Sequence, residues 1–372
     1  MIAHRCHPYE QRFGGKSMAR RKLRVGIIGL GIGARHATSY AQVPEAEIVA
    51  IADPAPGRLK TTPQEFCAHF GATYYADGYE MIDKERLDAI SICTNPIHHR
   101  PLAEAAARKG LHILMEKPMA GTNEDCDAIV AACRRAGVVL HMEFPMRQLP
   151  PMVELKRVLD TGKLGRPFMA SCDYVSGLRP PGHWIWTMGD GSSPVNENTC
   201  HGIDCVRYLL GDVDRIYAEA DNYIGQGPKE VPDAAAFTMH HVGGAISSVV
   251  GGACATNEME TPLRVSLFAT EGQAIVDGFR HTFHRLKWAN RRGESFERDW
   301  GEPPSFQAML NDPFARYTLL EPAIANFVHD VLAGRGPQAT AEDGRQNVEI
   351  CLAVLESATS RRAVDIRQPV VA

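Results

Sequence analysis

Short apolar runs alternate with segments of helical period from residue 23 to about 145. The runs are rich in Val, Ile and Leu, as buried strands are, and the segments between them, such as 98–109 and 123–136, carry apolar residues at helical spacing. This alternation predicts βαβ units around a doubly wound parallel sheet. The predicted strands are 23–29, 47–53, 88–94, 112–116 and 138–142.

The pattern changes after Pro150 and Pro151. One more helix is expected up to Gly162, and longer strands then follow one another through glycine-containing turns such as 241–244. Strands joined in this way are typical of an antiparallel sheet. Two amphipathic segments, 317–333 and 341–362, are predicted to be helices. The strands expected in this region are 167–175, 213–223, 234–241, 244–255, 262–270 and 272–277.

The length of 372 residues predicts two domains, because single hydrophobic cores stop growing near ~250 to 300 residues. Residues 1–22 are polar and lack periodicity, so we expect a flexible leader there. The change of pattern then separates an α/β domain, 23–147, from a strand-rich α+β domain, 148–372.

Composition excludes several classes of partner. The 40 Lys and Arg and 44 Asp and Glu residues leave a formal charge of −4, which provides no attraction to nucleic acid or to anionic membranes. No apolar run approaches the ~18 residues of a membrane span. The ten cysteines form no CxxC pair and the N-terminus lacks a signal-type apolar core, so we expect reduced thiols in a cytoplasmic protein.

A glycine-rich turn, GLGIG over residues 29–33, directly follows the first predicted strand and precedes a helix. Gly29 permits a tight turn, Gly31 lets the backbone approach a pyrophosphate, and the helix N-terminus offers N–H groups and a positive dipole end. Gly33 or Ala34 supplies the small residue where helix and strand pack. The context predicts a Rossmann dinucleotide site, and the alternative is a tight turn without a ligand.

Asp53 ends the second predicted strand, where a carboxylate that binds the ribose hydroxyls is expected about 20 positions after the glycines. A carboxylate repels a 2′-phosphate, so NAD is favoured over NADP. Arg58 is close enough in sequence to leave NADP possible.

Four motifs together resemble the Gfo/Idh/MocA oxidoreductase family, the group of glucose-fructose oxidoreductase and inositol dehydrogenase. They are VGIIGLG (25–31), VAIADP (49–54), TNPIHH (94–99) and GLHILMEKP (110–118), and the EKP tripeptide at a strand end is the most specific. The resemblance covers residues 23–212 and includes Arg147 and the DTGKLG segment, 160–165.

The resemblance implies a C-terminal domain with a large, open, mainly antiparallel sheet, whose face commonly forms a homodimer or homotetramer contact. It also implies a cleft in which a sugar or cyclitol lies between this domain and the nicotinamide. Lys117 would lie at the C-terminal edge of the parallel sheet, where ligands bind in doubly wound folds. The glycine-rich turn and the resemblance together assign cofactor binding to Gly29, Gly31, Ile32, Gly33, Asp53, Thr94, Asn95, His99, Glu116 and Lys117.

Candidate catalytic residues lie in the segment 196–204. If it is helical, Glu197 and His201 are i,i+4 and His201 and Asp204 are i,i+3, so all three share one face. An imidazole held by a carboxylate suits the removal of a hydroxyl proton, which makes His201 the candidate base. The resemblance gives Lys117 the role of stabilising the developing alkoxide. Glu197 stands where the family has Asp, so its own catalytic role stays open.

Each candidate has an ordinary structural alternative. Lys117 is otherwise a surface lysine or a partner of Glu116, and His201 is a core histidine or, with Cys200, Cys205 and Glu197, a metal ligand. The spacing is not that of a zinc site, so no metal is predicted. His98 and His99 follow a strand end and are candidates for contact with the nicotinamide ribose or the substrate. The alternative is that one of them only begins the next helix.

Substrate contacts are expected from residues that suit a sugar, because indole faces stack on C–H surfaces and Arg reaches hydroxyls. Arg179 and Trp186 share these properties, and core or interface packing is the alternative for the tryptophans. The predicted substrate-binding residues are Lys117, Arg147, Asp173, His183, Trp184 and Asp204.

Three functions follow. The first is an NAD(P)-dependent dehydrogenase or reductase for a sugar, inositol or related polyol. The second is a glycoside hydrolase that uses bound NAD for transient oxidation, and the third is a non-catalytic dinucleotide-binding sensor. The presence of both Lys117 and His201 argues against the sensor, and nothing beyond the shared core points to glycoside cleavage.

Overall fold

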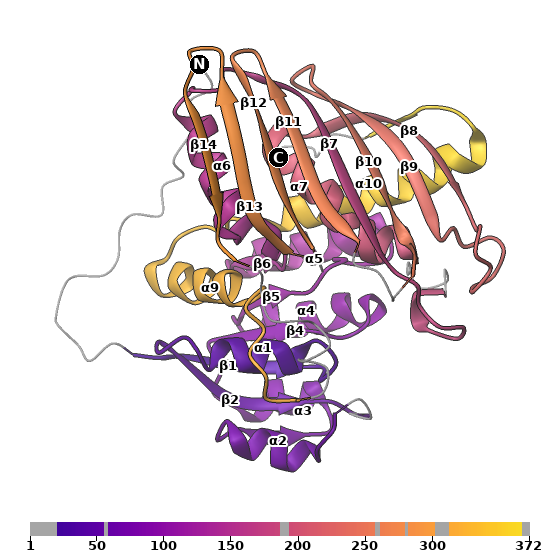
Figure 1. The fold of residues 1–372 in the computed structure, drawn as a ribbon. Helices are drawn as coiled ribbons and strands as arrows, with labels where there is room; N and C mark the ends of the chain where they lie inside the picture. The colour runs from indigo at the N-terminus through magenta and orange to yellow at the C-terminus, as the bar shows by residue number, and fades with distance from the viewer. Residues whose placement is uncertain are drawn as a thin grey trace.

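The computed structural model describes residues 21–55, 59–186, 193–256, 261–279, 282–301 and 312–366. Most of the predicted leader, and Arg58, therefore lie outside the described residues. The chain builds two sheets, one on each side of a set of helices (Figure 1).

The first sheet is parallel throughout and has six strands in the order β3-β2-β1-β4-β5-β6. The order reverses between β1 and β4, which creates the switch point where ligands bind in such folds. The strands are β1 (Leu23–Ile28), β2 (Ala46–Ala52), β3 (Thr73–Tyr75), β4 (Ala89–Ile92), β5 (His112–Met115) and β6 (Leu140–Met142). The helices between them are α1 (Gly33–Tyr40), α2 (Pro63–His69), α3 (Gly78–Lys84), α4 (His99–Arg108) and α5 (Asn123–Ala136).

The second sheet has nine strands in the order β14-β13-β12-β11-β7-β10-β9-β8-β15. Among the described strands of this second sheet only β7 and β10 pair in parallel, so the predicted, mainly antiparallel sheet is confirmed. The strands are β7 (Pro167–Gly177), β8 (Val213–Asp221), β9 (Ala234–His241), β10 (Ile246–Ala255), β11 (Pro262–Ala269), β12 (Gly272–Phe279), β13 (Thr282–Asn290), β14 (Ser295–Asp299) and β15 (Val364–Asp365).

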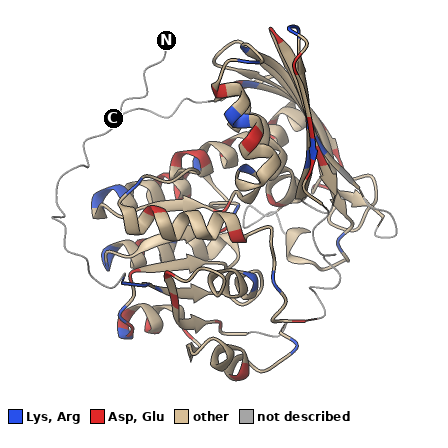
Figure 2. Cartoon of the chain, turned by 60° about the vertical axis from the view of Figure 1, so that its left-hand side comes forward, with Lys and Arg blue, Asp and Glu red and all other residues tan. Residues whose placement is uncertain are grey.

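Helices cover one face of the nine-stranded sheet, and no helix of the described residues lies on the other, here called the bare face (Figure 2). They are α6 (Pro150–Asp160), α7 (Cys200–Leu210) and α10 (Ala341–Ser360). The remaining helix, α9 (Glu321–Ala333), packs against α1. α10 contacts β8 on one side and α5 and β6 on the other, so it joins the two sheets. One apolar core is continuous from β1 and α1 to α7 and β7.

Several strands were not predicted. β3 is short, β13 alternates between apolar and charged residues with Arg285 and Lys287 facing solvent, and β14 has a single apolar residue, Phe296. No helix among the described residues is both long enough and apolar enough to cross a membrane.

Candidate active site

The glycine-rich turn connects β1 to α1 at the switch point. Gly29 has a φ of +95°, and a Cβ there would lie 2.6 Å from the carbonyl oxygen of Cys93. A Cβ on Gly33 would lie 3.0 Å from Ile27 Cγ2, so this glycine allows α1 to pack closely on β1. At Gly31 nothing lies within 4 Å of a Cβ position, and the backbone is exposed. The three glycines thus meet three different requirements.

Asp53 ties the end of β2 to this turn. Its Oδ2 accepts a hydrogen bond from the N–H of Leu30 at 2.6 Å, and its Oδ1 accepts one from the N–H of Ala55 at 2.7 Å. Open space at Gly31, the exposed Ile32 and the first turn of α1 fit a pyrophosphate, and a carboxylate beside the turn fits a ribose. The residues present therefore fit a dinucleotide.

In the segment that follows β4, the prediction for His99 has to be corrected. His99 is fully buried, and its two ring nitrogens lie 3.1 Å from the carbonyl oxygen of Met119 and 3.0 Å from that of Thr94. Burial lowers the pKa of His99. The histidine therefore links the segments that follow β4 and β5, and the prediction that it contacts the cofactor is wrong. The exposed Asn95 remains a cofactor candidate.

Glu116, at the end of β5, is turned into the protein. Its Oε1 lies 3.0 Å from Nε2 of His36 in α1, and its Oε2 accepts the backbone N–H of Lys117 at 3.2 Å. Burial raises the pKa of Glu116, but hydrogen bonding and the charge of His36 outweigh this and lower it. Both oxygens thus have protein partners. The sequence analysis missed His36, which occupies a fully buried position of α1.

Lys117, which follows β5, meets Glu197, which precedes α7. Its Nζ donates to Glu197 Oε1 at 2.5 Å and to the Glu197 carbonyl oxygen at 2.8 Å. The side chains are only 13% and 18% exposed, which rules out a surface lysine. Burial lowers the pKa of Lys117, but the Glu197 charge outweighs it and raises this pKa above its ordinary value. The pairing with Glu197 therefore favours the charged form of Lys117.

The segment around His201 is not one continuous α-helix. Residues Val195–Thr199 form a π-helical turn, and α7 starts at Cys200. A wider turn shifts the phase of the side chains before α7. Glu197 reaches Lys117, whereas the ring of His201 packs 5.4 Å from that of Tyr174 in β7. The helix expected over 196–204 is therefore interrupted before Cys200, whereas His201 and Asp204 keep their i,i+3 spacing within α7.

Comparison with known proteins decides the family. The description "Oxidoreductase family, NAD-binding Rossmann fold" matches residues 23–144, and "GFO/IDH/MocA C-terminal domain" matches residues 152–275. The chain belongs to the Gfo/Idh/MocA family. It has the NAD-binding fold of this oxidoreductase family, as the sequence analysis predicted.

Relatives of this Gfo/Idh/MocA protein span nearly its whole length. A myo-inositol 2-dehydrogenase of Thermotoga maritima is 24% identical over 93% of this chain and 99% of its own. A D-apiose dehydrogenase of Paraburkholderia graminis is 28% identical over 93% and 90%. Levoglucosan dehydrogenase in complex with NADH and levoglucosan has the same fold, with a TM-score of 0.80, 24% identity and coverage of 94% and 100%.

Three predicted substrate contacts need correction in this family member. Arg147 and Asp204 are only 4% and 1% exposed and bind each other, so neither is open to substrate. Asp173 neighbours Tyr174 in β7, and consecutive strand residues point to opposite faces. Because Tyr174 faces α7 and His201, Asp173 lies on the bare face of the sheet.

The loop after β7 carries the remaining substrate candidates. The rings of His183 and Trp184 lie 5.7 Å apart, and both side chains are partly exposed. Their contact with substrate stays a prediction. Trp186 is a packing residue, because it is buried and its Nε1 donates to the carbonyl oxygen of Pro180 at 3.0 Å.

The thiols near His201 have partners of their own. Cys200 Sγ donates to the carbonyl oxygen of Glu197 at 3.3 Å, and Cys205 Sγ lies 3.9 Å from Met146 Sδ. Over the part of the chain that the structure describes, no group of three or more His, Cys, Asp or Glu residues is arranged to hold a metal ion.

Proposed function

We propose that this Gfo/Idh/MocA protein is an NAD-dependent dehydrogenase or reductase for a secondary alcohol of a sugar, inositol or related polyol. The observation that carries the proposal is the buried Lys117–Glu197 pair, which places a fixed cation from the end of β5 against the turn that leads into His201. The names of the relatives, an inositol and an apiose dehydrogenase, support a polyhydroxylated substrate.

The proposed roles follow from charge and position. Lys117 stays protonated, so it orients the substrate hydroxyl and stabilises negative charge on its oxygen, while His201 accepts the hydroxyl proton. NAD supplies the acceptor for the hydride that leaves the same carbon. Oxidation of the alcohol therefore gives a carbonyl product, reduced cofactor and a protonated imidazole that returns its proton to solvent.

Glu197 is a positioning residue for Lys117 in this proposal. Burial raises the pKa of Glu197, and the Lys117 charge opposes the shift. The positive charge of Arg179 acts on Glu197 in the same direction as Lys117, which places Arg179 near the pair. We propose that Arg179, with His183 and Trp184, contacts the substrate.

Activity on a substrate panel tests the function. Polyols, aldoses and uronates are offered with NAD and with NADP, and absorbance at 340 nm reports net turnover. The proposal expects NADH formation with at least one polyol. Cleavage of aryl glycosides without net NADH formation would instead identify the glycoside hydrolase, and NADH binding without either reaction would identify the sensor.

Two variants test the roles. Lys117→Met removes a hydrogen-bond donor to the negative charge that develops on the substrate oxygen. Loss of one such donor slows turnover by about 10²–10³-fold. His201→Gln should slow it severely as well, while NADH binding, measured by fluorescence, persists in both. The exposed Lys109 and His329 provide the matched controls Lys109→Met and His329→Gln, which should keep wild-type rates. Near-normal turnover in either test variant removes that residue from the mechanism.

The bare face of the nine-stranded sheet is proposed as the contact with a second copy of the chain. Tyr217, Ile246 and Val250 are 43%, 51% and 46% exposed there, and strand pairing puts them on the same face as Asp173. A charge at the centre of this face, Val250→Glu, should shift the protein from a dimer or tetramer to a monomer in light scattering. A wild-type monomer contradicts the proposal.

A further inference from the structure

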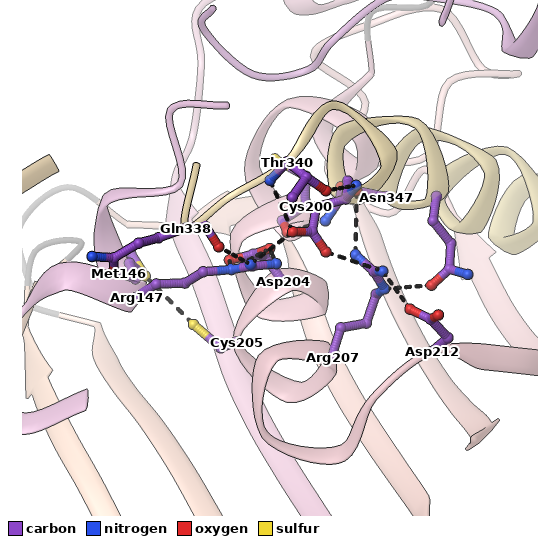
Figure 3. A network of polar contacts seen from close by, with 12 residues as sticks. Met146, Arg147, Cys200, Asp204, Cys205, Arg207, Asp212, Gln338, Thr340 and Asn347 are labelled. Carbon is purple, nitrogen blue, oxygen red and sulfur yellow. Dashed lines mark hydrogen bonds and ion pairs between the residues drawn. The ribbon is translucent and has the colours of Figure 1, made fainter. Parts of the chain in front are cut away.

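Arg147 joins three segments that are far apart in sequence (Figure 3). It lies in the 3₁₀ turn Pro145–Gln148 that follows β6. Its Nε donates to both carboxylate oxygens of Asp204 in α7, at 3.0 and 2.8 Å, and its Nη2 donates to Oδ1 at 2.5 Å. Its Nη1 donates to Asp343 Oδ2 in α10 at 2.9 Å and to the Gln338 carbonyl oxygen at 3.1 Å. One buried guanidinium therefore connects the first sheet to α7 and α10.

The α10 end of this network is rigid. Thr340 caps the helix, and Asp343 and Thr340 exchange two hydrogen bonds, each of 3.0 Å. Burial raises the pKa of Asp343, but Arg147 and Arg207 outweigh this and lower it to about 2. One turn further along α10, Asn347 Nδ2 donates to the carbonyl oxygen of Cys200 at 3.0 Å. The start of α10 thus holds the first residue of α7 directly.

Two of these bonds lie on either side of His201 along α7. Asn347 holds the carbonyl oxygen of the residue before it, and Arg147 holds the carboxylate of Asp204, one helical turn after it. Behind α7, a Cβ on Gly202 would lie 3.2 Å from Tyr174 Cβ, so the helix already packs closely on the sheet. Rotation or sliding of α7, either of which would redirect the imidazole, breaks several buried bonds at once.

Stability alone does not explain these charges. Replacing a buried ion pair by apolar residues of similar volume is often neutral or stabilising, because desolvation offsets the Coulomb attraction. An apolar contact between the positions of Arg147 and Asp204 would hold the two segments together, but it would not fix their relative orientation. The guanidinium fork, in contrast, bonds the carboxylate in one geometry.

We propose that Arg147, acting through Asp204 and together with Asn347, is a positioning residue that directs His201 toward the Lys117 ammonium. The inference rests on the proposed function, in which His201 accepts the hydroxyl proton. Arg147 does not touch substrate or cofactor in this role. It fixes the helix that carries the base relative to the strand end that carries the cation.

The variant Arg147→Lys keeps the charge and loses the fork. A misplacement of about 1 Å in catalytic geometry costs roughly 10²-fold in rate, so kcat should fall by about 10–100-fold. KM and the Kd for NADH should stay within about twofold. The isotope effect on kcat with substrate deuterated at the reacting carbon should rise, because hydride transfer becomes slower relative to the other steps.

Arg207→Lys is the matched control. Arg207 is as buried as Arg147 and also lies 3.4 Å from Asp343 Oδ1, but its hydrogen bonds go to Gln346, Asp212 and the Asp343 backbone rather than to Asp204. We expect a comparable fall in Tm with kcat near that of the wild type. An equal fall of kcat in both variants would show a general structural role and overturn the inference.

The double variant Arg147→Met with Asp204→Leu separates positioning from stability. It should regain stability without regaining kcat, and recovery of kcat together with stability overturns the inference. The histidine NMR signals give a readout without turnover, since His201→Gln identifies the signal of His201. Its titration should change in Arg147→Lys and not in Arg207→Lys. If no substrate is turned over but the His201 signal changes in Arg147→Lys, the proposed function fails and the positioning role of Arg147 stands. An unchanged His201 signal overturns the positioning role.

Discussion

Glu143 offers a test of the core beside the site. It follows β6, its N–H donates to the Met115 carbonyl oxygen at 2.7 Å, and the residue is 1% exposed. Within the described residues neither carboxyl oxygen has a hydrogen-bond partner. Burial, and next the charge of Glu116, raise the pKa of Glu143 well above its ordinary value. The raised pKa favours the protonated, neutral form of this side chain, whose oxygens have no hydrogen-bond partner among the described residues.

Removing this acid should stabilise the fold. A buried polar group without a hydrogen bond costs roughly 1–3 kcal/mol, and Met has similar length without that group. Glu143→Met should therefore raise the free energy of unfolding near pH 7 by about 1–3 kcal/mol. Urea unfolding followed by tryptophan fluorescence measures it. Glu356→Met, at an exposed position of α10, is the control and should change stability by less than about 0.5 kcal/mol.

The sign of the pH dependence follows from the raised pKa. An unfolded glutamate ionises near pH ~4.3, whereas Glu143 in the fold keeps its proton to higher pH. The folded state therefore binds more protons above this value, and its stability falls as pH rises toward the folded pKa. The Met variant lacks this loss, so its advantage should grow from pH 5 to pH 7. A variant less stable than the wild type, or an advantage independent of pH, would refute this account of Glu143.

Two further predictions concern the dinucleotide site. Gly29→Ala should lower Tm and abolish NADH binding, because of its positive φ and the close Cys93 carbonyl, whereas Gly31→Ala should keep Tm and weaken only NADH binding. Thermal unfolding measures Tm, and fluorescence titration measures NADH binding, in both variants. An equal loss of Tm in Gly29→Ala and Gly31→Ala would contradict the prediction. Asp53→Asn keeps an acceptor for the Leu30 N–H and removes the charge, so the ratio of kcat/KM for NADP to that for NAD should rise by about tenfold or more. An unchanged ratio would show that Asp53 does not exclude the 2′-phosphate.

The fold was largely readable from local patterns. Apolar runs and helical spacing gave the parallel sheet, and the glycine-containing turns gave the antiparallel one. The strands that were missed, such as β13 and β14, carry charged residues on their exposed side and so lack a continuous apolar run. Their pairing depends on contacts between distant segments, which periodicity does not report.

The site was readable only in part. Lys117 stood out through its motif, but its partner lies 80 residues away, and only folding shows which carboxylate meets it. Residues Val195–Thr199 are π-helical, which the apolar pattern does not predict, so the expected helix is interrupted before Cys200. Arg147 and Asp204 have the chemistry of sugar ligands in sequence, and their burial against each other decides otherwise.

The position of α10 has a consequence for biosynthesis. Asp343 and Asn347, which fasten the start of α7, belong to the last long helix of the chain, more than 130 residues after His201 has been made. A nascent chain therefore lacks the bonds from Asp343 and Asn347 until residues 341–360 have been made. In the proposed mechanism, the imidazole of His201 is held in place only once this last long helix has been added.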